Sequence, residues 1–132
     1  MLKLEIVTPE KRVVDETVDS VTVPTLSGEA GILPNHAPLI SALKPGILSF
    51  SNKGTVERLA VAGGFVEVSS DKVSVLTDVA ETAAEVDLEA VRADKQEAEK
   101  LLAASSGSSI DETSDVRDQL ELANARLQIA GR

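Results

Sequence analysis

Short runs in which apolar and polar residues alternate fill the first part of the chain. The opening run is the clearest: Leu2, Leu4 and Ile6 alternate with Lys3 and Glu5. A period of two is typical of a β-strand with one buried face. All five prolines and six of the eight glycines lie at or before residue 64, so these runs are short and separated by turns. The pattern predicts many short strands.

Two turn signals indicate how some of these strands pair. The turn sequence at 52–54, Asn-Lys-Gly, separates the strand-like runs 46–51 and 55–61, which predicts a β-hairpin. The sequence Ser-Asp-Lys at 70–72 has the same position between its two flanking runs. Strands at this spacing, turned by glycine and proline, favour an antiparallel β-sandwich or barrel.

Near residue 80 the pattern changes from strand to helix. Proline disappears, alanine becomes frequent, and opposite charges occur at helical spacing, as in Glu89 and Arg92. Asp87 precedes an apolar stripe and is a suitable N-cap. We therefore expect a helix over 88–104.

A second helix is expected over 111–130. Serine and glycine at 105–109 separate it from the first helix, and the sequence at 109–112, Ser-Ile-Asp-Glu, fits a capping box. The apolar stripes of both helices are narrow and rich in alanine, so we expect an antiparallel hairpin that is weakly attached and able to detach. The division predicted is a sandwich domain over 1–84 and a hairpin domain over 85–132.

The charge of the chain excludes several classes of partner. The formal net charge is −9, from 22 acidic against 13 basic residues, and the aromatic content is 2%. Nucleic acids require basic patches and favour aromatic stacking surfaces, so we expect no nucleic-acid binding. No apolar run approaches the roughly 20 residues that span a bilayer, so we expect no membrane insertion.

The residues needed for independent catalysis are missing from the sequence. His36 is the single histidine and there is no cysteine, which leaves no set of metal ligands and no nucleophile–base pair. No G-x-x-x-x-G-K-[ST] phosphate loop occurs, and paired carboxylates in so acidic a chain indicate a solvated surface. We expect no catalytic residue, no metal and no resident cofactor, and hence a protein that works by binding other proteins.

One segment carries a family resemblance. Residues 27–46 read S-G-E-A-G-I-L-P-N-H-A-P-L-I-S-A-L-K-P-G. This resembles the epsilon subunit of F-type ATP synthases, whose motif reads G-x-x-G-I-x-x-x-H-A-P-x-x-x-x-L-x-x-G. The sequences V-T-P-E at 7–10 and A-G-G-F-V-E-V at 62–68 also match that family. With the helical hairpin included, the resemblance covers essentially the whole chain.

The resemblance implies a fold, a function and a location. It implies a flattened ten-stranded β-sandwich followed by a two-helix hairpin, in a non-catalytic rotor subunit of the central stalk. That subunit binds the gamma subunit and the membrane-embedded c ring, and it helps to couple proton-driven rotation to ATP synthesis. Because the N-terminus lacks an Arg-rich transit sequence, the expected location is the cytoplasmic face of a bacterial inner membrane, peripheral through the complex. A plastid-encoded member, which would also lack that sequence, is the alternative.

The resemblance also assigns contact residues. Glu29 and Gly31 correspond to positions that meet the c ring, and His36 to a position close to gamma. In the family the hairpin either docks on the sandwich or extends along gamma and impedes ATP hydrolysis, its basic residues then meeting an acidic segment of the catalytic alpha and beta subunits. Arg117 and Arg126 are the candidates here, although carboxylates outnumber them in the second helix.

ATP is a further ligand implied by the resemblance. Some members bind ATP at the hairpin, and the matching positions here are Glu89, Arg92 and Arg126. An arginine found in ATP-binding members is replaced by Glu99, which disfavours a triphosphate. Without the resemblance, a stand-alone adaptor or ligand-binding sandwich with an unrelated partner remains open, and binding to isolated gamma distinguishes the two.

Overall fold

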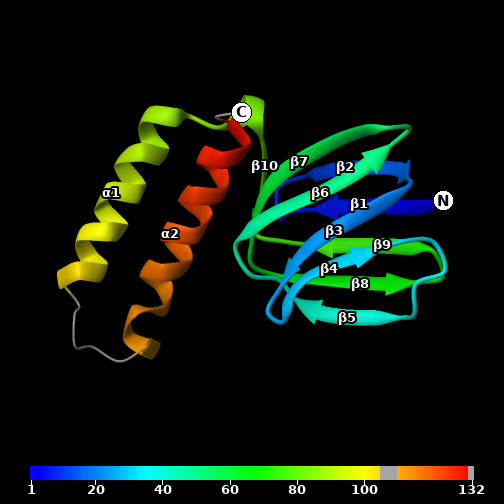
Figure 1. Cartoon of the computed structure of the whole chain (residues 1–132), viewed down its shortest axis with the longest axis horizontal. Helices are drawn as coiled ribbons and strands as arrows, with labels where there is room; N and C mark the ends of the chain where they lie inside the picture. Colours follow the sequence, from blue (N-terminus) through cyan, green and yellow to red (C-terminus); the bar gives the residue numbers. More distant parts are fainter. Residues whose placement is uncertain (105–109, 131–132) are drawn as a thin grey trace.

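Ten strands in two stacked sheets precede two helices in the computed structural model, which describes residues 1–104 and 110–130 (Figure 1). The first sheet contains, in spatial order, β2 (Arg12–Val18), β1 (Leu2–Val7), β9 (Lys72–Leu76), β8 (Phe65–Ser69) and β5 (Leu39–Ala42). The second sheet contains β10 (Val79–Thr82), β7 (Thr55–Ala62), β6 (Gly46–Asn52), β3 (Ser20–Thr25) and β4 (Gly28–Ile32). The expected β-sandwich of about ten strands with a C-terminal helical hairpin is confirmed.

Both predicted β-hairpins form through two-residue turns. Strands β6 and β7 pair from Asn52 opposite Thr55, and the turn between them has φ of 53° at Lys53 and 84° at Gly54. The turn between β8 and β9 likewise has positive φ at both central residues. Positive φ at both positions matches the twist of the flanking strands, so the turns set the register of both hairpins.

The hydrophobic core lies between the two sheets. The alternation seen in the sequence is reproduced, because Leu2, Leu4 and Ile6 are fully buried while Lys3 is exposed. The same inward-facing positions recur on strands of both sheets. The other core residues with at most 2% of their surface exposed are Val18, Val21, Val23, Ile32, Leu48, Phe50, Leu59, Val61, Val66, Val68, Val73 and Val75.

One pairing in the first sheet departs from a purely antiparallel arrangement. Strand β1 lies beside β9 in parallel, with Leu4 opposite Val73, while the other strand pairs are antiparallel. These strands stand near opposite ends of the sandwich sequence, so no hairpin turn fixes their relative direction. Burial of the alternating apolar face sets this register instead.

The hairpin follows the sandwich through a short 3₁₀ turn, η1 (Ala83–Glu85), and consists of α1 (Leu88–Ala104) and α2 (Ile110–Ala130). The N-cap prediction is confirmed, because the Ala90 N–H donates to the Asp87 carboxylate at 3.2 Å. The predicted break at 105–109 and the capping box at 109–112 lie outside the described residues. The predicted domain division at 84 and 85 falls within η1.

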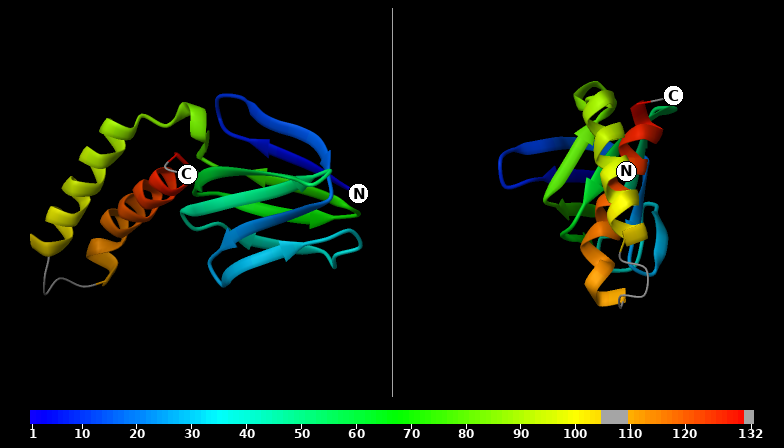
Figure 2. Two further views of the ribbon diagram at one scale, coloured as in Figure 1. Left: turned by 45° about the horizontal axis from the view of Figure 1, so that its top comes forward. Right: turned by 90° about the vertical axis from the view of Figure 1, so that its left-hand side faces the viewer.

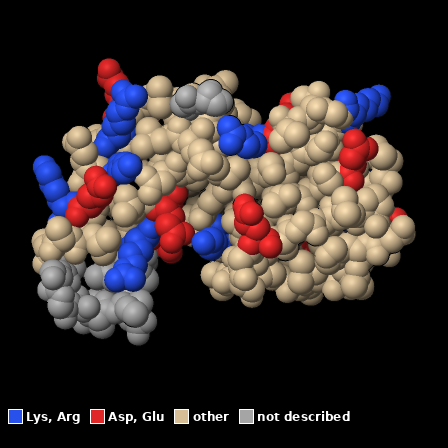
Figure 3. Space-filling model, viewed as in Figure 1, with Lys and Arg blue, Asp and Glu red and all other residues tan. Residues whose placement is uncertain are grey.

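Helix α2 packs against β6, β7 and η1, and α1 lies on the side of α2 away from the sandwich (Figures 1 and 2). Charged side chains of both signs cover the hairpin, whereas the face of the sandwich seen in Figure 3 carries few. Within the described parts of the chain, no helix is long and apolar enough to cross a membrane.

Candidate functional site: the sandwich–hairpin junction and the candidate contact residues

The apolar contact between the hairpin and the sandwich is small. Three residues are buried in it, Ala60 of β7 with Ala125 and Ile129 of α2. Half-buried residues packed around them are Ile47, Val86 and Leu122. Two of the three buried side chains are single methyl groups, so Ile129 supplies most of the hydrophobic contribution to docking.

A polar cleft of about 400 Å³ lies beside this contact, between α2, β10, η1 and the β1–β2 turn. Its charged lining residues are Glu10, Lys11, Asp78, Glu81, Glu85 and Arg126. Because carboxylates outnumber cations four to two, the cleft has a negative potential that favours a cation inserted from the helix.

Arg126 is the cation that α2 supplies to the cleft. Its Nε donates to Oε1 of Glu81 on β10, and the two side chains are 21% and 28% exposed. A charge-assisted hydrogen bond that is largely shielded from water is stronger than a surface ion pair. This contact therefore joins the last turns of α2 to the edge of the second sheet.

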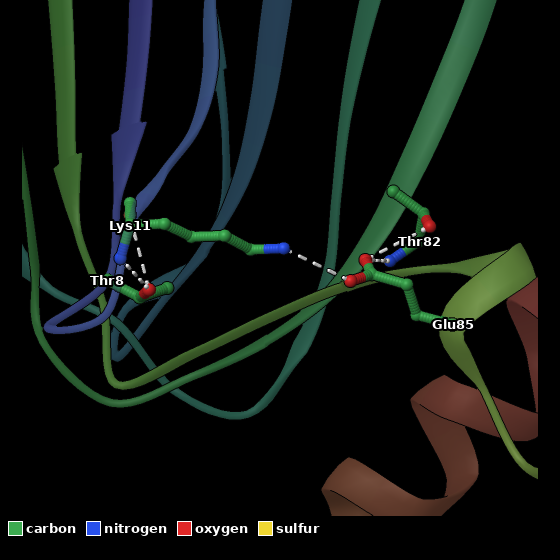
Figure 4. Close-up of polar contacts among 4 residues, drawn as sticks. All are labelled: Thr8, Lys11, Thr82 and Glu85. Carbon is green, nitrogen blue, oxygen red and sulfur yellow. Dashed lines mark hydrogen bonds and ion pairs between the residues drawn. The ribbon is translucent and has the colours of Figure 1, made fainter.

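A second polar network fixes η1 at the base of the hairpin (Figure 4). Oε1 of Glu85 accepts hydrogen bonds from the Thr82 N–H at 2.9 Å and the Thr82 hydroxyl at 3.1 Å. Nζ of Lys11 lies 3.5 Å from Oε2 of Glu85, and the Lys11 N–H donates to the Thr8 hydroxyl at 3.3 Å. The Thr82 backbone N–H, more than the Lys11 charge, lowers the pKa of Glu85 below its ordinary value.

The two predicted c-ring residues lie together on β4, an edge strand of the second sheet. Glu29 and Gly31 are both exposed. A Cβ added to Gly31 would meet no atom of this chain within 4 Å, so internal packing does not require a glycine there. Glu29 also lines a cleft of about 360 Å³ together with Lys44 and, from α2, Glu121.

The predicted gamma residue, His36, lies in the loop between β4 and β5. It is half-buried, its ring Nδ1 is 2.6 Å from the Ala37 carbonyl oxygen, and its backbone N–H donates to the Leu33 carbonyl at 3.2 Å. The Asn35 N–H donates to the Asp71 carboxylate at 2.7 Å, which holds this loop against the β8–β9 turn. That turn lies at the end of the sandwich away from the hairpin (Figure 1).

The residues predicted on the hairpin are not brought together by direct contacts. Arg117, Glu89 and Arg92 are exposed, and no ion pair joins any of them to a side chain described at 1–104 or 116–130. Arg126 instead pairs with Glu81, a residue that the sequence analysis missed. Among the side chains described at 1–104 and 116–130, no group of three or more histidine, aspartate or glutamate residues is placed to hold a metal ion.

The fold and the site define a class of protein: a well-packed β-sandwich that carries a pair of helices through a small apolar contact and an ion pair. Residues 1–83 match the family described as "ATP synthase, Delta/Epsilon chain, beta-sandwich domain". The ATP synthase epsilon chain of Desulforamulus reducens is 50% identical over 109 residues, which cover 83% of this chain and 82% of the relative. That of Halalkalibacterium halodurans is 41% identical over 133 residues, covering 99% and 98%.

A solved structure agrees with these relatives. A chain in the cryo-EM structure of the Euglena gracilis mitochondrial ATP synthase, OSCP/F1/c-ring, superposes with a TM-score of 0.79 at 25% identity, covering 99% of this chain and 81% of that one. The chain therefore belongs to the delta/epsilon-chain family of ATP synthase, as a non-catalytic, epsilon-type subunit of the central stalk. The family resemblance found in the sequence is confirmed.

Proposed function

We propose that the chain is a rotor subunit that bridges the gamma subunit and the c ring, and that it couples rotation of the ring to ATP synthesis. The observation that carries this proposal is the well-packed sandwich with its candidate contact residues in two places, Glu29 and Gly31 on β4 and His36 in the loop before β5. A body of this kind transmits torque because its close-packed core resists deformation. The expected location is the cytoplasmic face of a bacterial inner membrane, held there by the complex.

The gamma contact is proposed to extend from His36 along the outer face of the first sheet. Exposed apolar side chains follow the loop on that face: Ile40 on β5, then the cross-strand pair of Phe65 and Leu76, which are 57% and 58% exposed. Neighbouring exposed apolar residues on one sheet face are characteristic of protein interfaces.

Binding to isolated gamma subunit tests this contact. Replacing Phe65 and Leu76 together by aspartate is expected to weaken binding at least tenfold, since burying two charges without partners is unfavourable. The matched control is Val56→Asp, at an exposed apolar position of the second sheet, which should bind normally. Equal loss in both variants would contradict the proposed face, and no binding by the unmodified chain would favour an adaptor with another partner.

The c-ring contact is proposed for Glu29 and Gly31. An exposed carboxylate beside a position without a side chain allows a basic loop to pair with Glu29 while its backbone approaches Gly31 closely. Proton-driven ATP synthesis by membrane vesicles that carry the assembled complex is the test. Glu29→Lys should lower coupled synthesis while leaving the sandwich folded, and undiminished synthesis would remove Glu29 from the contact.

The hairpin is proposed to regulate ATP hydrolysis by the alpha and beta subunits. In its extended position Arg117 and Arg126 would meet an acidic segment of those subunits. The small apolar contact at the junction supports such a movement. Deleting residues 88–132 and measuring hydrolysis by the assembled complex tests it: hydrolysis should rise, and an unchanged rate would contradict an inhibitory role.

ATP binding at Glu89, Arg92 and Arg126 stays a prediction. Arg126 already has a carboxylate partner in the docked hairpin, so a nucleotide would have to displace Glu81. Calorimetry with the isolated chain at millimolar ATP checks this point, and no heat of binding would mean that no useful site exists.

A further inference from the structure

Arg126 has a different partner in each of the two proposed positions of the hairpin. In the docked hairpin its guanidinium pairs with Glu81 in the polar cleft, at the edge of the second sheet. The other acidic groups facing that cleft are Glu10, Asp78 and Glu85, and the one other cation is Lys11. Lys11 is already directed to Glu85, so Arg126 is the cation available to Glu81 among the described residues.

The ion pair makes a substantial part of the attachment, because the apolar contact beside it is small. The apolar contact buries Ala60, Ala125 and Ile129, whereas the Arg126–Glu81 contact is a charge-assisted hydrogen bond with both side chains mostly shielded. Removing one partner of such a pair leaves a poorly solvated charge, which is more costly than losing an exposed pair. Docking should therefore depend strongly on these two residues.

Arg126 cannot pair with Glu81 and with a partner subunit at the same time. Strand β10, which carries Glu81, belongs to the sandwich, and Arg126 belongs to the helix that would move away. Extension would break the pair and leave the guanidinium free for an acidic surface elsewhere. Arg117, on the same helix, is exposed and does not line the polar cleft, so its position does not depend on Glu81.

We propose that Glu81 is an internal competitor for Arg126: it holds the arginine while the hairpin is docked and thereby keeps it from the acidic segment of a partner subunit. This inference rests on the proposed regulatory function of the hairpin. Arg126 then forms a contact in both states, whereas Glu81 contributes to the docked state alone. Substitutions at the two residues should therefore act alike on docking and differently on inhibition.

Docking is measured first in the isolated full-length chain. Because the sequence has no cysteine, spin labels can be attached at two introduced cysteines, at the exposed positions Val56 on β7 and Glu97 on α1, and their separation followed by pulsed electron resonance. Glu81→Gln and Arg126→Gln should each raise the undocked fraction about tenfold. The exchanged pair Glu81→Arg with Arg126→Glu should restore docking, and Arg117→Gln should leave it unchanged.

Inhibition is then measured as ATP hydrolysis by the assembled complex. Glu81→Gln should lower hydrolysis several-fold, because it frees Arg126 for the partner. Arg126→Gln should not lower it, although it undocks the hairpin equally, and the exchanged pair should behave like Arg126→Gln. If both single variants lower hydrolysis to the same extent, or if neither changes docking, the competitor role is overturned. If deletion of residues 88–132 leaves hydrolysis unchanged, the proposed regulatory function itself fails.

Discussion

The core of the sandwich and the junction with the hairpin are held by different kinds of contact. The core joins Val, Leu and Ile side chains from both sheets, many of them fully buried. The junction combines one buried isoleucine and two alanines with the ion pair of Arg126 and Glu81. Burial of large apolar side chains gives a rigid, cooperative unit, whereas a small polar junction can open without disturbing it. From this difference we propose a fixed body and a movable appendage.

The largest effect is expected at a glycine inside the sandwich. At Gly64 φ is +88°, and an added Cβ would lie 1.8 Å from the Leu76 carbonyl oxygen. Gly64→Ala should therefore cost more than about 4 kcal/mol of unfolding free energy, because backbone strain and a backbone clash add together. Denaturant unfolding of the full chain measures this loss. The control is Gly31→Ala, which has open space and should change stability by less than about 1 kcal/mol.

The second-largest loss of unfolding free energy is expected from a cavity in the core. Leu48 of β6 is fully buried between the sheets, and Leu48→Ala should lower the free energy of unfolding by about 3 kcal/mol. Urea unfolding followed by circular dichroism measures the change. The same truncation of a mostly exposed residue, Val56→Ala on β7, should cost less than about 0.5 kcal/mol. Equal losses at the two sites would argue against a packed core.

A substitution at the junction should loosen the hairpin alone. Ile129→Ala removes the one large buried side chain of the junction and should weaken docking by about 2 kcal/mol, while the urea midpoint of the sandwich stays the same. Limited trypsin digestion after Arg117 and Arg126 should become faster. Glu97→Ala, at an exposed position of α1, is the control for altered helix propensity. Loss of the sandwich midpoint in Ile129→Ala would show that the two parts unfold together.

The smallest effect is a pH dependence at the base of the hairpin. The pKa of Glu85 lies below its ordinary value of 4.5, chiefly because the Thr82 backbone N–H donates a hydrogen bond to the carboxylate. This contribution to stability is present above pH 4.5 and is lost as the pH falls through the lowered pKa. Since the side chain is 40% exposed, the loss should be a fraction of a kcal/mol.

Acid titration of the full chain against Glu85→Gln measures that contribution. The variant should be the less stable of the two above pH 4.5, and the difference should shrink as the pH is lowered. A difference that does not vary between pH 6 and pH 3 would mean that the Thr82–Glu85 contact contributes nothing through its charge.

Local signals in the sequence predict the elements well. The turn sequence at 52–54, the N-cap at Asp87 and the helix over 88–104 are confirmed, because each depends on neighbouring residues. The parallel pairing of β1 with β9 carries no such signal, since it is set by packing between strands far apart in the chain. Periodicity indicates which face is buried but not which strand becomes the neighbour.

The candidate site is less accessible to sequence analysis. Glu29, Gly31 and His36 were assigned by family resemblance, and from the residues alone their segment is a proline-stiffened connection. The pairing of Arg126 with Glu81, 45 residues earlier, depends on how α2 lies against β10, which no spacing rule predicts. The sequence indicates this pairing only in a general way. Narrow, alanine-rich helical stripes predict a weak apolar attachment, so polar contacts have to contribute to docking.

Native-state hydrogen exchange of the isolated full-length chain tests the contrast between body and appendage most directly. Amides in the buried strands β1, β8 and β9 should exchange with an opening free energy equal to that of global unfolding. Amides in α2 should exchange through an opening at least about 2 kcal/mol less costly, and Glu81→Gln should lower that value further without affecting the strands. If α2 and the buried strands share one opening free energy, the hairpin is part of a single cooperative unit and the account is contradicted.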